Sequence, residues 1–165
     1  MTTSFDTHAP TYDAQFTHGL TGSVQRKQIW DYLASEPWFQ EARSILDIHC
    51  GTGEDALWLA SQGHIVTATD VSESMLTNAR SKDRTGLTAP PQFLKHDLLE
   101  TEWGWPENSF DAVLSNFAGL NCVDPGAMNV VAANIYRILR PGGRFVVVLF
   151  GKYCFISSSL ARIAV

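Results

Sequence analysis

The sequence lacks the cysteine and histidine patterns of a metalloprotein or a disulfide-bonded protein. Its three cysteines, Cys50, Cys122 and Cys154, are widely spaced and form no Cys-x-x-Cys pair, so neither a zinc site nor a disulfide framework is indicated. The five histidines form no i, i+4 pair and no cluster with cysteine. We therefore expect no bound metal and reduced, buried thiols.

Basic residues are too few for a nucleic-acid-binding surface. The chain has 12 Lys and Arg against 17 Asp and Glu, a formal net charge of −5 and a pI near 5.4. Sequence-independent binding of DNA or RNA depends on a positively charged surface, so we expect no nucleic-acid partner. The expected partner is a small molecule.

Long apolar runs are also missing. No stretch approaches the roughly 18 consecutive apolar residues of a membrane span. The polar start MTTSFDTHAP has neither the basic nor the apolar region of a signal peptide. We expect a cytoplasmic protein with no membrane partner. At 165 residues, 45% of them hydrophobic, the chain can form one domain around a core.

Short apolar segments alternate with segments of helical composition from Ser44 onward. The expected strands cover residues 44–48, 65–70, 92–97, 110–116 and 144–150. The expected helices cover residues 23–35, 54–62, 72–82 and 125–139, with Ser72 and Asp124 as the N-caps of the last two. Strands that alternate with helices and are apolar on both faces indicate a parallel sheet covered on both sides. The sequence therefore predicts a doubly wound, Rossmann-like α/β fold with five mostly parallel strands.

The chain divides into three parts. Residues 1–22 are polar and poorly periodic and are expected to form an arm or lid, residues 23–150 form the sheet domain, and residues 151–165 begin a C-terminal extension or substrate-covering segment. Ligands of doubly wound sheets bind beyond the carboxyl ends of the strands. This rule places Asp47–Gly53, Asp70, Asp97 and Asn116 along one edge of the sheet.

The glycine-rich turn predicts a ligand that contains adenosine. Gly51–Ala56 satisfies the pattern G-x-G-x-x-G/A, and Asp70 ends the next strand as a ribose-binding acid does. Taken alone, this fits NAD. However, Asp47, Glu54 and Asp55 surround the place of the NAD pyrophosphate and would repel it. A ligand with both a cation and a carboxylate suits this turn better, and S-adenosylmethionine carries both.

Several segments together resemble class I S-adenosylmethionine-dependent methyltransferases of the small-molecule type. Order and spacing agree over residues 43–150, and the matching segments are Ile45–Gly53, Thr69–Met75, His96–Leu98, Phe110–Asn116 and Leu139–Phe145. Residues 5–13 also resemble the N-terminal segment with which many such enzymes cover the cofactor. The resemblance implies the strand order 3-2-1-4-5 and methyl transfer to a small-molecule acceptor, with S-adenosylhomocysteine as the product.

The resemblance also implies roles for residues of the glycine turn and the neighbouring strand ends. Gly51 and Gly53 would let the backbone approach the methionine moiety, and Asp47 would lie near its ammonium group. Asp70 would bind the two ribose hydroxyls, and Asp97 would face the adenine amino group. Asp70 could instead cap the helix that begins near residue 72.

The remaining cofactor contacts follow from the same resemblance. Val71 and Met75 would pack against adenine, and Leu98 would offer its backbone. Asn116 and Phe117 would line the methionine side, where the methyl group emerges, although an asparagine at a strand end is equally typical of a turn.

Two further positions complete the predicted cofactor site. Tyr12 is the candidate for closing it, and His49 stands where the family has a glycine, which changes the approach of the backbone at that one position. No residue is assigned as catalytic, because methyl transfer from a sulfonium mainly requires positioning and exclusion of water.

The family sheet has seven strands, the last two in an antiparallel hairpin, whereas we expect this sequence to supply only five. Phe145–Phe150 would then be an exposed apolar edge that invites pairing. The chain could be a fragment of a longer polypeptide, a homodimer that pairs through this edge, or a non-catalytic remnant that only binds the cofactor. An NAD-type oxidoreductase is the other alternative.

Overall fold

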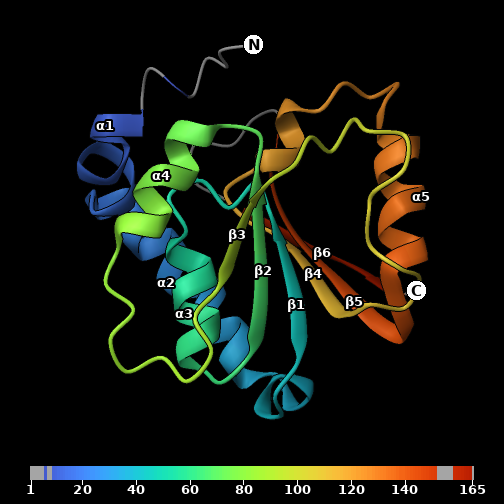
Figure 1. The fold of residues 1–165 in the computed structure, drawn as a ribbon, viewed down its shortest axis with the longest axis horizontal. Helices are drawn as coiled ribbons and strands as arrows, with labels where there is room; N and C mark the ends of the chain where they lie inside the picture. The colour runs from blue at the N-terminus through green and yellow to red at the C-terminus, as the bar shows by residue number, and fades with distance from the viewer. Residues whose placement is uncertain (1–5, 7–8, 152–157, 165) are drawn as a thin grey trace.

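The protein forms a single mixed sheet with helices on both faces in the computed structural model (Figure 1). The structure describes residue 6, residues 9–151 and, as backbone, residues 158–164. The strands are β1 (Ser44–Ile48), β2 (Ile65–Asp70), β3 (Gln92–Lys95), β4 (Phe110–Ser115), β5 (Leu139–Phe150) and β6 (Ser158–Ala164). Their order in the sheet is β3-β2-β1-β4-β5-β6. The first five strands are parallel and β6 is antiparallel to β5.

Helices cover the two faces of the sheet unequally. The helices are α1 (Ala9–Tyr12), α2 (Leu20–Ser35), α3 (Glu54–Ser61), α4 (Glu73–Ser81) and α5 (Met128–Ile138). A π-helical turn at Asp13–Thr17 and 3-10 turns at Pro37–Gln40 and Gly119–Cys122 complete the helical elements of the described residues. Figure 1 shows α2, α3 and α4 on one side and α5 on the other. The predicted five parallel strands, their order and their two helical layers are confirmed.

The alternation of side chains along β1 divides the core between the two layers. Ile45 packs into the cluster that contains Leu33 of α2 and Leu59 of α3, whereas Leu46 packs into the cluster that contains Val131 and Ile135 of α5. A strand buried on both faces is what the apolar run at residues 45–48 predicts. Burying β1 at the centre brings its carboxyl end, with Asp47, between the ends of β2 and β4.

The start of α5 differs from the prediction. Asp124 was expected as the N-cap, but α5 begins at Met128 with Ala127 as its N-cap. The Asp124 carboxylate accepts a hydrogen bond from the backbone N–H of Gly126 at 2.7 Å, and Ala127 N donates to the Asp124 carbonyl. Asp124 therefore closes a separate turn, a local bond that competes with helix capping.

The prediction that no strand follows β5 is wrong. Residues 158–164 form β6, which pairs with β5 from Arg144↔Ala164 to Phe150↔Ser158. The edge of β5 is therefore covered, and the expected homodimer through that edge loses its structural reason. β5 also begins earlier than predicted, at Leu139, with a register shift opposite residues 110–112. The expectation for residues 152–157 lies outside the described residues.

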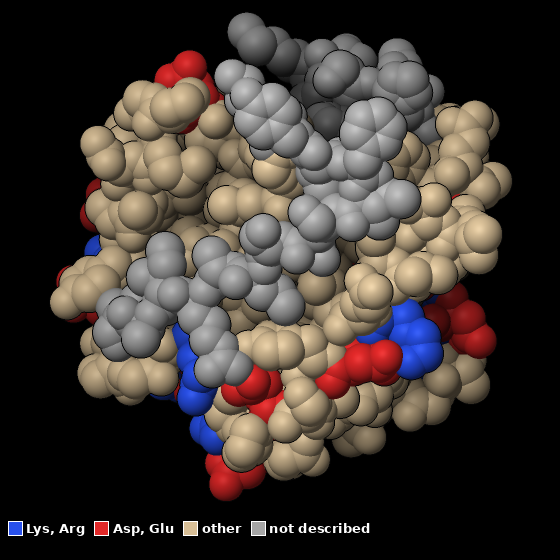
Figure 2. Space-filling view, turned by 180° about the vertical axis from the view of Figure 1, so that it is seen from behind, with Lys and Arg blue, Asp and Glu red and all other residues tan. Residues whose placement is uncertain are grey.

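Charge is scattered over the surface that Figure 2 shows. From behind, much of this face is uncharged, and acidic side chains lie beside basic ones along its lower part (Figure 2). Among the described residues, no helix is long and apolar enough to cross a membrane, and no group of histidine, cysteine or carboxylate side chains could hold a metal ion.

Candidate functional site

The turn after β1 is built from residues with left-handed backbone conformations. His49, Gly51 and Gly53 have φ values of 57°, 53° and 79°. Cys50 N donates to the Thr69 carbonyl at 2.9 Å, which ties the turn to the end of β2. Glycine adopts this conformation without steric cost. The sequence G-T-G therefore fixes a sharp turn between β1 and α3, as its position in the sequence predicts.

The two glycines of the turn serve different purposes. Gly51 lines the cavity described below, and a Cβ atom at this position would meet no atom within 4 Å. A Cβ atom at Gly53 would lie 2.7 Å from the Phe93 ring and 2.9 Å from Ala79 Cβ. Gly53 thus allows α4 and β3 to pack against the turn, and only Gly51 leaves the backbone open to a ligand.

A cavity of about 380 Å³ opens at the carboxyl ends of the strands. Of the twelve residues predicted to bind the cofactor, ten line it: Tyr12, His49, Gly51, Asp70, Val71, Met75, Asp97, Leu98, Asn116 and Phe117. Asp47 and Gly53 do not line it. The volume falls in the usual range of small-molecule sites, and the topology places the cavity where doubly wound sheets bind ligands.

Asp70 lines the cavity and holds two backbone N–H groups, but it is not the N-cap of α4. Its Oδ2 accepts the Gly51 N–H and its Oδ1 accepts the Ser72 N–H, both at 2.9 Å. Ser72 itself is the N-cap of α4, because its Oγ accepts the Met75 N–H at 3.2 Å. Asp70 thus fastens the turn and the start of α4 while it lines the cavity. Each carboxylate oxygen keeps a further lone pair for a ligand.

Asp47 is a buried carboxylate in need of a cation. It is 1% exposed, and its Oδ2 has no hydrogen-bond partner among the described residues. Burial raises the pKa of Asp47 well above its usual value, Asp55 and Asp70 raise it further, and Arg26 acts in the opposite direction. Because an unpaired buried charge is costly, a cationic ligand group beside Asp47 would stabilise the ionised form of the Asp47 carboxylate.

Unpaired polar atoms gather beneath the cavity. Seven buried side-chain atoms lack a partner in the described part of the chain, and five of them belong to residues at or just after the carboxyl ends of strands. These five residues are Asp47, His49, Thr69, His96 and Ser115, of which His49, Thr69 and His96 line the cavity. Buried polar groups are normally hydrogen-bonded. Unpaired ones gathered near a cavity are typical of a site in which a ligand completes the hydrogen bonds.

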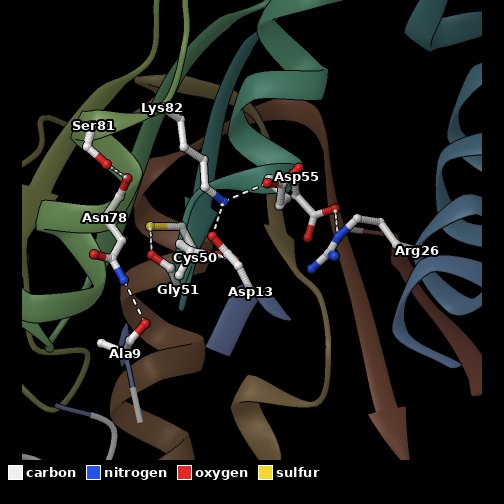
Figure 3. Close-up of polar contacts among 11 residues, drawn as sticks. Ala9, Asp13, Arg26, Cys50, Gly51, Asp55, Asn78, Ser81 and Lys82 are labelled. Atoms are coloured by element: carbon white, nitrogen blue, oxygen red, sulfur yellow. Dashed lines mark hydrogen bonds and ion pairs between the residues drawn. The ribbon is translucent and has the colours of Figure 1, made fainter. Parts of the chain in front are cut away.

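A buried ion network from α2 reaches the same strand ends. Asp55 accepts hydrogen bonds from Arg26 Nε at 3.3 Å, Trp30 Nε1 at 2.7 Å and Asn116 Nδ2 at 3.1 Å. The Arg26 guanidinium also lies 4.3 Å from the centre of the Phe117 ring. Figure 3 shows Arg26 and Asp55 meeting beside the glycine turn. Arg26 therefore places a positive charge behind the wall of the cavity.

Asn116 and the residues after it form a strained wall. Asn116 Oδ1 accepts the Phe117 N–H at 2.7 Å, and Phe117 and Ala118 both have left-handed backbones with φ values of 51° and 57°. Such conformations are rare for residues other than glycine and tend to occur at functional sites. The His49 imidazole packs against the next residue, where a Cβ atom on Gly119 would lie 2.6 Å from its Nδ1.

The loop after β3 closes the far end of the cavity. Asp97 Oδ1 accepts the Leu99 N–H at 2.9 Å, and the buried Leu98 accepts the Trp103 indole N–H with its carbonyl at 3.3 Å. His96 lies between the rings of Trp103 and Trp105. The predicted adenine-facing residues are thus held by a rigid aromatic cluster.

Residues 45–143 match the family model described as a methyltransferase domain. The chain belongs to this family. It is 30% identical to the demethylmenaquinone methyltransferase of Symbiobacterium thermophilum, over 86% of this chain and 55% of that protein. It is 33% identical to the glycine N-methyltransferase of Rattus norvegicus, over 62% of this chain and 39% of that protein.

The solved structures agree with the family. An S-adenosylmethionine-dependent methyltransferase from Methanosarcina mazei superposes with a TM-score of 0.60 and 28% identity, over 69% of this methyltransferase domain and 55% of that chain. The domain spans about half or less of the length of the curated relatives named above. These relatives are methyltransferases, and neither they nor the family model favours an NAD-type oxidoreductase.

The clearest site residue that the sequence interpretation missed lies outside the matched segment. Arg26 belongs to the same helical stripe as Ile29 and Leu33, and all three are buried. A charged side chain on the buried face of a helix needs a partner. That pattern is visible in the sequence and could have identified Arg26 as a buried charged residue with a structural or functional role. It could not have identified its partner, Asp55 in α3.

Proposed function

We propose that the protein transfers a methyl group from S-adenosylmethionine to a small-molecule acceptor. The observation that carries the proposal is the buried Asp47 carboxylate, unpaired at Oδ2 within the described chain, beside a cavity of about 380 Å³ and a turn opened by Gly51. NAD would place its anionic pyrophosphate at this turn, whereas the α-ammonium group of S-adenosylmethionine matches Asp47 in charge.

The residues present fit such a cofactor. Asp47 would face the ammonium group, Arg26 would balance the carboxylate, and Asp70 would accept hydrogen bonds from the ribose hydroxyls. Asp97 would face the adenine amino group, and the buried Met75 would pack on the ring. Contacts within the chain orient three of these side chains: two backbone N–H donors hold Asp70, Leu99 N holds Asp97, and Asp55 holds Arg26.

When bound, the cofactor supplies an activated methyl group on a sulfonium. The chain has to hold the donor in line with the acceptor and keep water away, because the displacement itself needs no protein nucleophile. The wall formed by Asn116, Phe117 and Ala118 is rigid and largely apolar, which suits both tasks. A small-molecule acceptor is supported by relatives named for demethylmenaquinone and glycine.

Calorimetric titration with S-adenosylhomocysteine tests the proposal. We expect binding by the wild type and a loss of about 30-fold or more in affinity for Asp47→Asn, in line with the cost of removing one partner of a buried charge pair. The exposed Asp31→Asn serves as the matched control and should bind normally, since Asp31 pairs only with Lys27 at the surface. Binding of NAD by the wild type with no binding of S-adenosylhomocysteine would reverse the assignment.

The pH dependence of binding identifies Asp47 as the responsible group. Because burial raises the pKa of Asp47 in the free protein, binding an ammonium ion requires loss of that proton. Affinity for S-adenosylhomocysteine should therefore rise with pH until Asp47 is ionised in the free protein, and Asp47→Asn should flatten the slope. The affinity for 5′-methylthioadenosine, which lacks the amino-acid part, should be the same in both proteins.

Methyl transfer is a separate measurement. Incubation with methyl-labelled S-adenosylmethionine and a small-molecule extract should label a low-molecular-weight product. Cofactor binding with no labelled product from any extract would favour the alternative of a non-catalytic remnant.

A further inference from the structure

The N-terminal segment lies across the glycine turn and α4 through polar contacts. The Asp6 carboxylate accepts a hydrogen bond from Ser72 Oγ at 2.5 Å, and the Ala9 carbonyl accepts one from Asn78 Nδ2 at 2.7 Å. The contact between α1 and α4 is visible in Figure 3 as the line from Ala9 to Asn78. These residues are far from their partners in sequence, so the segment is held by tertiary contacts rather than by its own short helices.

Lys82 is the centre of the strongest of these contacts. Its Nζ lies 2.9 Å from Asp13 Oδ2 and 2.6 Å from Glu54 Oε1, and Figure 3 shows it reaching toward Asp13. Asp13 also accepts a hydrogen bond from Thr52 Oγ1 at 2.5 Å. One ammonium group thus joins the N-terminal segment, the first residue of α3 and the end of α4.

The cluster is shielded enough for its charges to matter. The side chains of Lys82, Asp13 and Glu54 are 18%, 25% and 24% exposed, whereas the surface pair Lys27–Asp31 is 71% and 63% exposed. Burial alone would raise the pKa of Asp13, but the contacts with Lys82 and Thr52 hold it below its usual value. Asp13 is therefore ionised at neutral pH.

Removing Lys82 would convert attraction into repulsion. Two carboxylates, on Asp13 and Glu54, converge on this single cation. Without it, two like charges would face each other in a partly dry site, which disfavours the present arrangement. Asp13 would then move away from the turn and take its neighbours with it.

The position of Asp13 determines that of Tyr12, which lines the cavity. At the other end, the segment is anchored to α2, since a Cβ atom on Gly22 would lie 2.0 Å from the Phe16 carbonyl. Residues 13–17 between these points form a π-helical turn, a conformation that is rare and frequent at functional sites. The segment is thus fixed at one end by its packing against α2. At the other end it is held by hydrogen bonds from Ser72, Asn78 and Thr52 and by the ion pair with Lys82.

We propose that Lys82 is a positioning residue that holds residues 9–17 closed over the cavity and thereby limits the rate at which the cofactor enters and leaves. This inference rests on the proposed function. By holding this segment, Lys82 controls the rate of cofactor exchange. It does not contact the reacting atoms.

Stopped-flow measurement of S-adenosylhomocysteine binding, followed by tryptophan fluorescence, tests the inference. In Lys82→Met both the association and the dissociation rate should rise, the latter by about tenfold or more, because a charge-assisted tie is lost. Lys82→Arg keeps the charge and should restore slow exchange. Lys27→Met removes an exposed ion pair of α2 and should behave as the wild type.

Hydrogen exchange of the ligand-free protein separates this inference from the proposed function. The amides of residues 9–17 should exchange faster in Lys82→Met than in the wild type or in Lys27→Met. If the wild type binds no S-adenosylhomocysteine, the proposed function fails and this exchange still decides whether Lys82 holds the segment. Unchanged amide exchange in Lys82→Met would overturn the inference. If the wild type binds S-adenosylhomocysteine, equal association and dissociation rates in Lys82→Met and the wild type would overturn it as well.

Discussion

The turn after β1 and helix α2 contribute to one site by different physical means, since Gly51 of the turn lines the cavity and Arg26 of α2 lies behind its wall. The turn acts through backbone conformation, with Gly51 and Gly53 at positive φ and the Gly51 N–H donated to Asp70. Helix α2 acts through side-chain charge, with Arg26 bound to Asp55 29 residues later in the chain. Backbone conformation is encoded in neighbouring residues, whereas an ion pair of this kind is encoded only in two distant positions.

The largest effect should come from breaking the ion network. Asp55→Ala leaves the Arg26 guanidinium buried, with its side chain 11% exposed, and removes the acceptor of Trp30 and Asn116. Loss of one partner of a buried pair costs about 3–5 kcal/mol. Urea unfolding should show this loss for Asp55→Ala, and about 0.5 kcal/mol or less for the exposed Asp31→Ala. Equal losses in the two variants would show that the buried network contributes no more to the free energy of unfolding than a surface ion pair does.

A smaller loss should follow from breaking the turn. Gly53→Ala places a Cβ atom 2.7 Å from the Phe93 ring at a φ of 79°, and should cost about 2–3 kcal/mol from crowding and backbone strain. Gly51→Ala meets no atom within 4 Å and should cost about 1–2 kcal/mol from strain alone. The same unfolding assay measures both. A larger cost at Gly51 than at Gly53 would contradict the division of roles between the two glycines.

The smallest effect concerns a histidine at the amino end of the same sheet. His64 is fully buried, and its Nδ1 accepts the Arg43 N–H at 3.2 Å. Burial lowers the pKa of His64, and the charge of Arg43 lowers it further. The unfolded chain therefore takes up the proton more readily, so stability is complete above pH 6.5 and falls as the pH drops toward the lowered pKa.

Melting temperatures between pH 7.5 and pH 5.5 test this sign. The wild type should melt at a lower temperature at the acidic end, and His64→Gln, which keeps an acceptor for Arg43 but has no proton to gain, should show a shallower slope. Burial lowers the pKa of His49 and His96 in the same direction, whereas the raised pKa of Asp47 acts in the opposite one. If the melting temperature depends on pH equally in wild type and variant, His64 does not contribute to the pH dependence of stability.

The sequence predicted what depends on neighbours in the chain. The strand at residues 44–48, the glycine turn and Ser72 as the N-cap of α4 were all found, because apolar runs, G-x-G and a serine before a helix act within a few residues. The prediction of Asp124 as an N-cap was wrong because a second local bond, from the Gly126 N–H, was also available to its carboxylate. Which of two local bonds forms depends on packing that the sequence does not display.

The sequence could not predict what depends on distant residues. β6 begins with two serines, a residue type that does not favour a strand, and it forms a strand because β5 offers its edge. Arg26, Lys82 and Asp13 carry no motif, and their importance arises when folding brings residues 28 or more positions apart into contact. Ten of the residues that line the cavity were predicted, and all of them except Tyr12 sit at or just after strand ends and helix starts that short motifs define.

His49 and Gly119 can be regarded as one unit in the design of variants. The imidazole occupies the volume that a side chain at position 119 would need, with 2.6 Å between Nδ1 and the missing Cβ. Enlarging position 119 alone creates a clash, whereas exchanging His49→Gly together with Gly119→Ser moves the bulk from the turn to the opposite wall. The pair therefore offers a route for enlarging the inner end of the cavity, because the serine side chain fills only part of the volume that the imidazole leaves.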